Sequence, residues 1–273
     1  MLQLFATDLD GTILAKNAPF NPKDVEVLKV LATHGVIRVA ATGRTLQSAL
    51  SVLSDDFPLD YLVFSSGAGI YCWKEKKLLQ TRHLGYEKAK DLVEVFQQFK
   101  VEYTLHHPIP ENHLFFHPEG ADPHPDFERY LQFNDAAAEC INGKLPQLDY
   151  TQILAFLPNV EMLEEIRNMV QDVKVVRATS PIDGQSIWME CFHPQVSKAN
   201  GILQVCKFEQ CHPENVVVVG NDYNDLDMLN HFDQAFVVSN APNDLKQNYT
   251  VLADVYSAPL VDWYKRFSQL SQQ

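Results

Sequence analysis

Short apolar runs alternate with segments of helical periodicity over the first 82 residues of the chain. The apolar runs have the length of strands, and they cover residues 4–7, 36–41, 61–64, 70–73 and 78–81. Between the first two, Asn21 and Pro22 are typical of a helix N-cap and its first residue, and Gly35 is typical of a helix end. Residues 45–53 predict a second helix. This order predicts a parallel α/β sheet that ends in a hairpin.

The pattern changes after residue 83 and returns near residue 190. Helices are predicted over residues 86–99 and 160–170, and short strands over residues 101–106, 114–117, 152–157, 173–177 and 186–192. Strands that pair locally around two helices are typical of an α+β domain. The chain then predicts a helix that opens at Ser197, strands over residues 216–219 and 234–238, a short helix near Asp244 and a closing helix over residues 260–270.

Polar side chains follow the predicted parallel strands at the point where each strand ends. Asp8 and Asp10 follow the first strand, Thr42, Gly43 and Arg44 follow the second, and residues 221–225 (Asn-Asp-Tyr-Asn-Asp) follow the strand at residues 216–219. Because the carboxyl ends of parallel strands meet at one edge of a sheet, we expect these groups to line one crevice. Lys198, in the first turn of a predicted helix, is unfavourable there unless it faces water or an anion.

Composition narrows the classes of partner. The chain has 273 residues, 46% of them hydrophobic, a formal net charge of -13 and a pI near 5.1. That charge disfavours nucleic acid and anionic membranes as partners. We expect a cytoplasmic protein, because the N-terminus lacks the basic region of a signal peptide and the five cysteines lack CxxC spacing. The sequence does not predict an oligomeric state.

Residues 105–127 hold five of the ten histidines, His106, His107, His113, His117 and His124, among several prolines. We interpret the segment as a solvated surface loop. A loop that contacts the substrate and a metal site are the alternatives, and the metal site is disfavoured because the spacing lacks an i, i+4 histidine pair or a cysteine partner.

The strand-end residues have complementary tasks in phosphate ester hydrolysis. Mg²⁺ and Lys198 would neutralise the phosphate oxygens, while Thr42 and the backbone N–H groups after it would hold the phosphate in line with Asp8. Asp8 would attack phosphorus to form an aspartyl-phosphate. Asp10 would protonate the leaving alkoxide and then deprotonate the attacking water.

The order Asp8-Leu9-Asp10-Gly11-Thr12, Thr42-Gly43-Arg44, Lys198 and Gly220-Asn221-Asp222-Tyr223-Asn224-Asp225 resembles the haloacid dehalogenase superfamily, specifically its Cof-like phosphatases. The resemblance implies a Rossmann-like catalytic core over residues 1–82 and 190–273, with an α/β cap domain inserted at residues 83–189. It also implies a Mg²⁺-dependent phosphatase that acts on small phosphorylated metabolites, with sugar phosphates as the favoured class.

Carried over residue by residue, the resemblance implies that Asp8 is the nucleophile and Asp10 the acid and base. It implies phosphate or substrate binding by Thr42, Gly43, Arg44, Lys198 and Asn224. The carboxylate of Asp8 and the backbone carbonyl of Asp10 would bind the metal. Which of Asn221, Asp222 and Asp225 completes that site stays open, because Asn221 stands where the family usually has aspartate. Ser66 likewise replaces a usual asparagine.

Other activities fit the sequence less well. A dehalogenase would give Asp10 no leaving alkoxide, a phosphomutase generally carries its cap earlier in the chain, and a transport ATPase needs membrane spans. A dinucleotide-binding enzyme would need a GxGxxG turn after the first strand. The alternative that remains is a weakly active or inactive phospho-ligand-binding protein, which the loss of one carboxylate at Asn221 favours.

Overall fold

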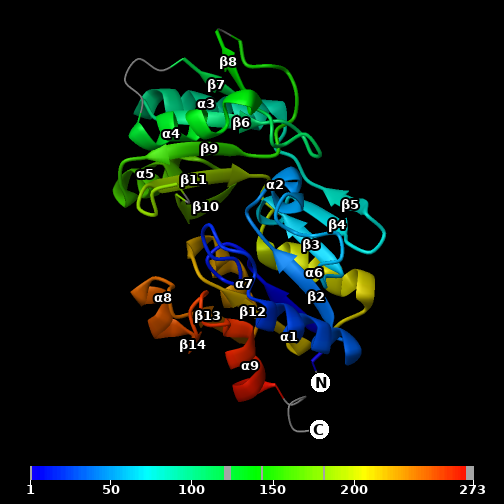
Figure 1. Cartoon of the computed structure of the whole chain (residues 1–273). Coiled ribbons are helices and arrows are strands. Elements are labelled where there is room, and N and C mark those ends of the chain that lie inside the picture. The colour runs from blue at the N-terminus through cyan, green and yellow to red at the C-terminus, as the bar shows by residue number, and fades with distance from the viewer. Residues whose placement is uncertain (1, 120–123, 143, 181, 269–273) are drawn as a thin grey trace. The chain divides into compact units, whose positions relative to one another are not determined.

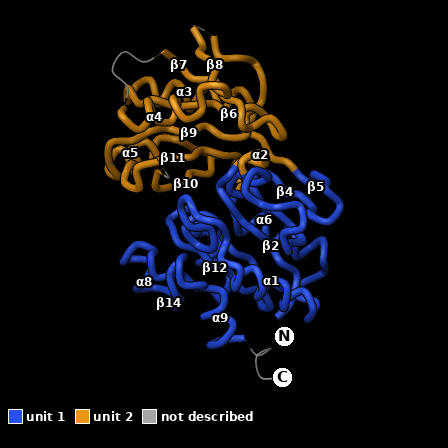
Figure 2. Tube along the Cα trace, in the orientation of Figure 1, with its two compact units in different colours: residues 1–44, 49–80, 197–273 blue, residues 45–48, 81–196 orange. Residues whose placement is uncertain are grey.

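The computed structural model describes residues 2–119, 124–142, 144–180 and 182–268. The described chain divides into two compact units, which Figure 2 shows in different colours. Unit 1 comprises residues 1–44, 49–80 and 197–273, and unit 2 comprises residues 45–48 and 81–196. The predicted junction between residues 189 and 190 falls inside a strand of unit 2, Ile187–Phe192, and the chain returns to unit 1 at Ser197.

The described part of unit 1 forms an eight-stranded sheet in the order β14-β13-β12-β1-β2-β3-β4-β5 (Figure 1). Neighbours from β14 to β3 pair in parallel, and β4 returns antiparallel to β3. The predicted α/β class is therefore confirmed. The strands are β1 (Leu4–Thr7), β2 (Ile37–Ala41), β3 (Tyr61–Phe64), β4 (Gly69–Cys72), β5 (Lys77–Thr81), β12 (Val216–Gly220), β13 (Gln234–Val238) and β14 (Thr250–Leu252).

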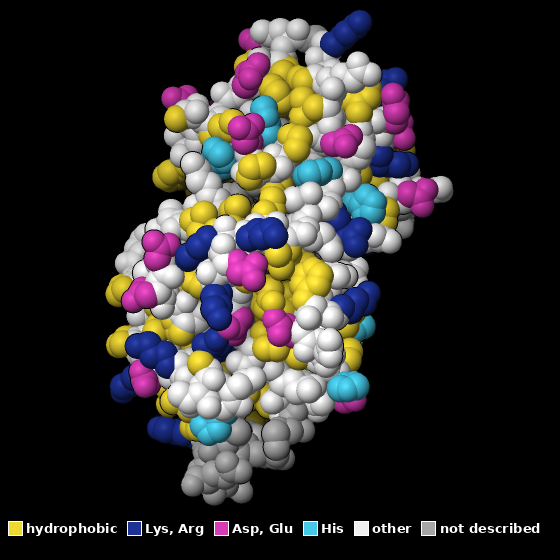
Figure 3. Space-filling view, turned by 90° about the vertical axis from the view of Figure 1, so that its right-hand side faces the viewer, with side chains coloured by type: hydrophobic (Ala, Val, Ile, Leu, Met, Phe, Trp, Pro, Cys, Tyr) yellow, Lys and Arg dark blue, Asp and Glu magenta, His cyan; other side chains and the backbone are white. Residues whose placement is uncertain are grey.

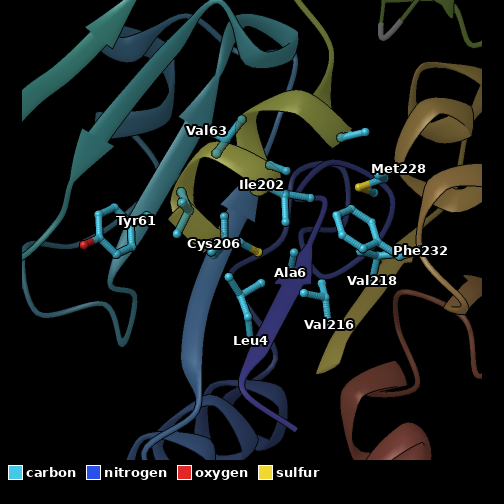
Figure 4. Close-up of a cluster of buried hydrophobic side chains, with 14 of the residues drawn as sticks. Leu4, Ala6, Tyr61, Val63, Ile202, Cys206, Val216, Val218, Met228 and Phe232 are labelled. Carbon is cyan, nitrogen blue, oxygen red and sulfur yellow. The ribbon is translucent and has the colours of Figure 1, made fainter. Parts of the chain in front are cut away.

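The side chains of β1 point alternately to the two faces of this sheet. Leu4 and Ala6 pack with Ile202 and Met228 of two helices on one face, in the buried cluster that Figure 4 shows. Phe5 points to the other face, where its ring lies 4.5 Å from that of Trp263. β1 is thus buried on both sides, as its continuous apolar run predicts. The helices of unit 1 are α1 (Pro22–Thr33), α6 (Lys198–Glu209), α7 (Leu226–His231), α8 (Asn243–Asn248) and α9 (Pro259–Phe267), and α2 (Leu46–Leu50) spans the boundary with unit 2.

The described part of unit 2 forms a six-stranded sheet in the order β10-β11-β9-β6-β7-β8. Its pairs are antiparallel apart from β7 with β8. Ile153 and Ala155 of β9 pack with the helices α3 and α5, whereas Leu154 and Phe156 pack with Phe127 of α4 on the opposite face. The elements are α3 (Tyr86–Phe99), β6 (Glu102–His106), β7 (Phe115–Pro118), α4 (Pro125–Phe133), β8 (Ala138–Ile141), β9 (Ile153–Leu157), α5 (Val160–Met169), β10 (Lys174–Thr179) and β11 (Ile187–Phe192).

The histidine-rich segment differs from the predicted surface loop. His106 is a buried residue of β6, and its Nδ1 lies 2.9 Å from the carbonyl oxygen of Asn112. Burial lowers the pKa of His106 to about 4, so the ring is neutral at pH 7. Helix α4 and strand β8 were not predicted, and residues 120–123 of the segment lie outside the described residues.

The closing helix, predicted over residues 260–270, is observed as Pro259–Phe267, and residues 269–270 lie outside the described part. All five cysteines are described and none forms a disulfide. No helix in the described ranges is long and apolar enough to cross a membrane.

Asp24 ties α1 to α9. Its Oδ1 accepts hydrogen bonds from the backbone N–H groups of Leu260 at 2.9 Å and Val261 at 3.3 Å, whereas its buried Oδ2 has no hydrogen-bond partner among the described residues. Burial raises the pKa of Asp24 to about 6, although the two N–H groups lower it. The ionised carboxylate is therefore costly in the folded protein.

Asp24→Asn should remove one source of pH dependence in the free energy of unfolding. Because the folded pKa exceeds the unfolded one, the contribution of Asp24 to stability is full below about pH 4 and is lost as the pH rises through 6. A shift of this size corresponds to roughly 3 kcal/mol. Urea unfolding at pH 4.5 to 8 should show the variant gaining on the wild type as the pH rises. Parallel pH profiles would contradict this prediction.

Candidate active site

Asp8 lies at the carboxyl end of β1, the strand between β12 and β2 at the centre of the unit 1 sheet. Its backbone N–H donates to the carbonyl oxygen of Val219 at 2.9 Å, so the hydrogen bonding between β1 and β12 continues as far as Asp8. The residue is only 4% exposed. A carboxylate that is both buried and fixed by the sheet needs a compensating charge.

Lys198 supplies that charge. Ser197 caps α6 by accepting a hydrogen bond from the backbone N–H of Asn200 at 3.0 Å, which places Lys198 as the first residue of the helix. The Lys198 ammonium donates to Oδ1 of Asp8 at 2.7 Å and to Oδ1 of Asp225 at 2.6 Å. The lysine is 1% exposed, so it does not face water, and two carboxylates offset the unfavourable position of a cation at the helix start.

Burial and neighbouring charges shift the pKa values of both Asp8 and Lys198. Burial raises the pKa of Asp8 to about 7, with Lys198 lowering it and Asp225 and Asp10 raising it further. Burial alone lowers the pKa of Lys198, but Asp225 and Asp8 raise it more, so its pKa ends above the ordinary value. The lysine therefore stays charged at neutral pH, while the ionised form of Asp8 depends on positive charge nearby.

Asp225 is engaged on both carboxylate oxygens. One binds Lys198, and the other accepts the backbone N–H groups of Asn221 at 2.7 Å and Asp222 at 3.1 Å. Asp222 caps the short turn that follows, accepting the N–H of Tyr223 at 2.8 Å. Asp222 and Asp225 were both predicted as possible metal ligands. In this structure their carboxylates accept hydrogen bonds from protein groups.

Asn221 is the loop residue that faces Asp8. One atom of its side-chain amide lies 3.0 Å from the hydroxyl of Thr12, 3.2 Å from Oδ2 of Asp8 and 3.0 Å from the backbone carbonyl oxygen of Asp10. With the amide oxygen in that place, a carboxylate, a carbonyl and an amide oxygen converge, and these are the donors that a hard divalent cation prefers. The donor set therefore fits Mg²⁺. It holds a single carboxylate, and among the described residues no group of three or more His, Cys, Asp or Glu side chains could hold a metal.

The carboxylate of Asp10 binds the side chain of Arg44. The guanidinium of Arg44 donates through Nε to one carboxylate oxygen at 2.6 Å and through Nη2 to the other at 2.7 Å. Gly11 follows in the left-handed conformation (φ 77°), which turns the chain after Asp10. Arg44, predicted as a substrate-binding residue, is in this structure the bidentate partner of Asp10.

The turn that follows β2 lies beside the loop that follows β12. The hydroxyl of Thr42, which is buried, accepts the backbone N–H of Arg44 at 3.1 Å. A Cβ at Gly43 would lie 3.6 Å from Nδ2 of Asn224 and 3.7 Å from the hydroxyl of Ser66. The structure thus brings Thr42, Gly43, Ser66 and Asn224 into one neighbourhood at the carboxyl edge of the sheet.

The comparisons with known proteins agree with this architecture. A family description, haloacid dehalogenase-like hydrolase, matches residues 5–257. The chain belongs to the haloacid dehalogenase-like hydrolases. Its predicted superfamily, Cof-like branch, Rossmann-like fold and hydrolase class are confirmed.

Relatives of this hydrolase cover nearly the whole chain. A candidate phosphatase of Metamycoplasma hominis is 26% identical over 258 residues, 91% of this chain and 90% of its own. The pyridoxal phosphate phosphatase YbhA of Escherichia coli is 20% identical over 266 residues, 92% of each chain. Among solved structures, the HAD subclass IIB sugar phosphatase BT4131 has a TM-score of 0.80 at 17% identity and covers 97% of this chain and 98% of its own.

Two residues of this haloacid dehalogenase-like hydrolase were not assigned a role from the sequence. The hydroxyl of Thr12 lies 3.1 Å from Oδ2 of Asp8 and 3.0 Å from the amide of Asn221, so it links the loop after β1 to the loop after β12. Gly67 (φ 102°) lies so close to Ser197 that a Cβ would overlap the carbonyl oxygen of Ser197 and lie 2.7 Å from its carbonyl carbon. A small-residue loop at residues 65–69 was the signal in the sequence for this close approach.

Gly67→Ala should destabilise the hydrolase by about 2 to 4 kcal/mol, because backbone strain at positive φ adds to overpacking against Ser197. Gly35→Ala is the matched control. Gly35 also has positive φ (70°), but a Cβ there would have no atom within 4 Å, so we expect a loss of about 1 kcal/mol. Urea unfolding compares the two variants. Equal losses would contradict the close packing of Gly67 against the backbone of Ser197.

Proposed function

We propose that the protein is a Mg²⁺-dependent phosphatase of small phosphorylated metabolites that works through an aspartyl-phosphate on Asp8. One observation carries the proposal. The buried Asp8 carboxylate is held at a strand end with the Lys198 ammonium on one oxygen, and with the Thr12 hydroxyl and the Asn221 amide on the other. This arrangement fixes a nucleophile next to positive charge that a phosphate also needs.

The first step forms a bond between an oxygen of Asp8 and phosphorus and breaks the bond between phosphorus and the ester oxygen. The leaving alkoxide takes a proton from Asp10, which is two residues along the chain. In the second step a water attacks phosphorus, gives a proton back to Asp10, and releases inorganic phosphate and the Asp8 carboxylate. Asp10 thus acts as acid and then as base, so no net proton is consumed at the enzyme.

Arg44 is proposed as the positioning residue for Asp10. Its two hydrogen bonds fix both carboxylate oxygens, at 2.6 and 2.7 Å. Asp10 keeps 47% of its side chain exposed. Donation to the leaving group then requires that at least one of the two bonds to Arg44 opens.

A bound Mg²⁺ would be held by the Asp8 carboxylate, the backbone carbonyl of Asp10 and the amide oxygen of Asn221. When bound, it would supply positive charge that favours the ionised form of Asp8 and offsets the charge of the phosphate oxygens. The chain itself supplies the Lys198 ammonium, the hydroxyl of Thr42 and the backbone N–H groups that follow it as phosphate contacts. Asn224, beside Gly43, is proposed as a further polar contact.

The substrate class rests on analogy and on charge. Relatives are named as phosphatases of pyridoxal phosphate and of sugars, and we propose a sugar phosphate or a metabolite of similar size. On the face that Figure 3 shows, Lys and Arg side chains are scattered among Asp and Glu side chains, with no basic stripe for nucleic acid. We also propose that unit 2 is the cap that selects substrates, and that the protein is cytoplasmic and acts independently of membranes.

Phosphate release from a panel of substrates tests the proposed function. The panel contains hexose and pentose phosphates, nucleoside monophosphates, pyridoxal phosphate and flavin mononucleotide, each with Mg²⁺ or with EDTA. We expect release from at least one small monoester in Mg²⁺ and none in EDTA. Equal release in EDTA would contradict the metal dependence.

The second candidate is a phospho-ligand-binding protein without turnover. The neutral side chain of Asn221 favours it, because a site with one carboxylate fewer binds a divalent cation less tightly. Calorimetric titration with the same panel distinguishes the two. Saturable binding of a monoester without phosphate release in Mg²⁺ would support the second candidate and overturn the first.

A further inference from the structure

The side-chain amide of Asn221 fits its place in two orientations that differ only by an exchange of nitrogen and oxygen. With nitrogen inward, the amide N–H group can donate to the Asp10 carbonyl at 3.0 Å, to Oδ2 of Asp8 at 3.2 Å and to the hydroxyl of Thr12 at 3.0 Å. With oxygen inward, the amide oxygen faces the Asp8 carboxylate and the Asp10 carbonyl, which can only accept hydrogen bonds. In the second orientation the Thr12 hydroxyl, at 3.0 Å, is the one group among the described residues that can donate to the inward oxygen, and the outward nitrogen faces only donors, so this orientation needs a cation among the oxygens to be favourable.

Contacts at both ends of the Asn221 side chain restrict its movement. The backbone N–H of Asn221 is bound to Asp225 at 2.7 Å, which fixes the start of the side chain. Its outer end packs against the bare Cα of Gly11, where a Cβ would overlap Nδ2 and lie 3.1 Å from Cγ. Because the two ends of an amide have nearly the same volume, the exchange fits within the packed site.

Thr12 can follow the exchange without losing its hydrogen bond. Its hydroxyl lies 3.1 Å from Oδ2 of Asp8 and 3.0 Å from the amide of Asn221. When nitrogen is inward, the hydroxyl accepts from Asn221 and donates to Asp8. When oxygen is inward, the hydroxyl can donate to that oxygen, and Oδ2 of Asp8 becomes available to a cation.

We propose that Asn221 is an amide switch that closes the cation site with its N–H group when the cation is removed and opens it by presenting its oxygen. The inference rests on the proposed cation site of the phosphatase. A carboxylate at this position could act only as an open ligand, because it has no N–H group to donate. The chain therefore exchanges cation affinity for stability of the cation-free protein.

Asn221→Asp tests the switch without any turnover. In EDTA, the new carboxylate faces Asp8 and the Asp10 carbonyl with no donor, so the variant should melt at a lower temperature than the wild type. In titrations with Mg²⁺, it should bind about tenfold more tightly or better, because ligand charge sets affinity for hard cations. Added Mg²⁺ should accordingly raise its melting temperature more than that of the wild type.

Asn230→Asp is the matched control, because it adds the same charge at an exposed residue of α7 that does not contact the site. It should leave both the EDTA melting temperature and the Mg²⁺ affinity near the wild-type values. A variant Asn221→Asp as stable in EDTA as the wild type, or one that binds Mg²⁺ no more tightly, would overturn the switch.

The amide can also be observed directly. In the ¹⁵N spectrum of protein labelled at asparagine, the side-chain NH₂ pair missing from Asn221→Asp identifies Asn221. Addition of Mg²⁺ should move this pair, because its hydrogen bonds to Asp8 and Asp10 are lost. A pair that stays in place while Mg²⁺ binds would overturn the proposal. None of these readouts needs phosphate release, so failure of the switch and failure of the proposed phosphatase are distinguishable.

Discussion

Replacing Asp8 by asparagine is expected to lower turnover by at least about 10⁴-fold and to leave the fold intact. An amide cannot form the acyl-phosphate bond. Without that bond, the other residues of the site have no covalent intermediate to form or to hydrolyse. The amide oxygen of the variant can still accept the hydrogen bond from Lys198 that Asp8 accepts at 2.7 Å. Steady-state phosphate release, with circular dichroism and urea unfolding in parallel, measures both parts of the prediction.

The matched control is Asp233→Asn, which makes the same chemical change at an exposed residue of unit 1. It should keep wild-type turnover. Turnover by Asp8→Asn within tenfold of the wild type, at a wild-type unfolding midpoint, would exclude Asp8 as the nucleophile.

Lys198→Met should produce the largest loss of stability, about 3 to 5 kcal/mol, together with loss of turnover. The ammonium lies between the carboxylates of Asp8 and Asp225, at 2.7 and 2.6 Å, and all three groups are buried. Removal of one partner of a buried ion pair leaves uncompensated charge in a medium of low polarity. Urea unfolding at pH 8 measures the loss.

Two further variants separate this explanation from a general effect of substitution in α6. Lys207→Met, at an exposed lysine of the same helix, should change the unfolding free energy by less than about 0.5 kcal/mol. Adding Asp225→Asn to Lys198→Met should restore part of the lost stability, because one buried charge is then removed. If the double variant is less stable than the single one, the buried charges are not the cause.

The sequence predicted which strand ends meet, because the rule that parallel strands deliver their carboxyl ends to one edge needs only the order of the elements. Asp8, Thr42 and Asn221 follow from that rule. Lys198 follows from the second signal, a lysine at a helix start, where the helix dipole disfavours it.

The sequence could not assign tasks among polar residues within one loop. In residues 221–225, Asp222 caps a turn, Asp225 binds Lys198 and two backbone N–H groups, and Asn221 faces Asp8. These choices depend on which backbone N–H groups the turn leaves to be satisfied, and composition does not specify them. Arg44 likewise follows the Thr42-Gly43 turn, but its length lets it reach Asp10.

Helix α4 was missed although the sequence held a signal for it. His124 accepts the N–H of Asp126 at 3.2 Å as the cap, and Pro125 begins the helix. Phe127, Tyr130 and Leu131 then form an apolar stripe at helical spacing. The prolines and histidines before residue 124 outweighed this short pattern, because they are typical of loops.

The most direct test of the aspartyl-phosphate is to trap it. The enzyme is mixed with its best substrate from the panel in Mg²⁺, quenched in acid during turnover and reduced with borohydride, which converts an acyl-phosphate of aspartate to homoserine. Peptide mass spectrometry should then find homoserine at position 8, in the wild type with substrate and not in the sample without it. Turnover with aspartate unchanged at position 8, or homoserine at another position, would contradict the account.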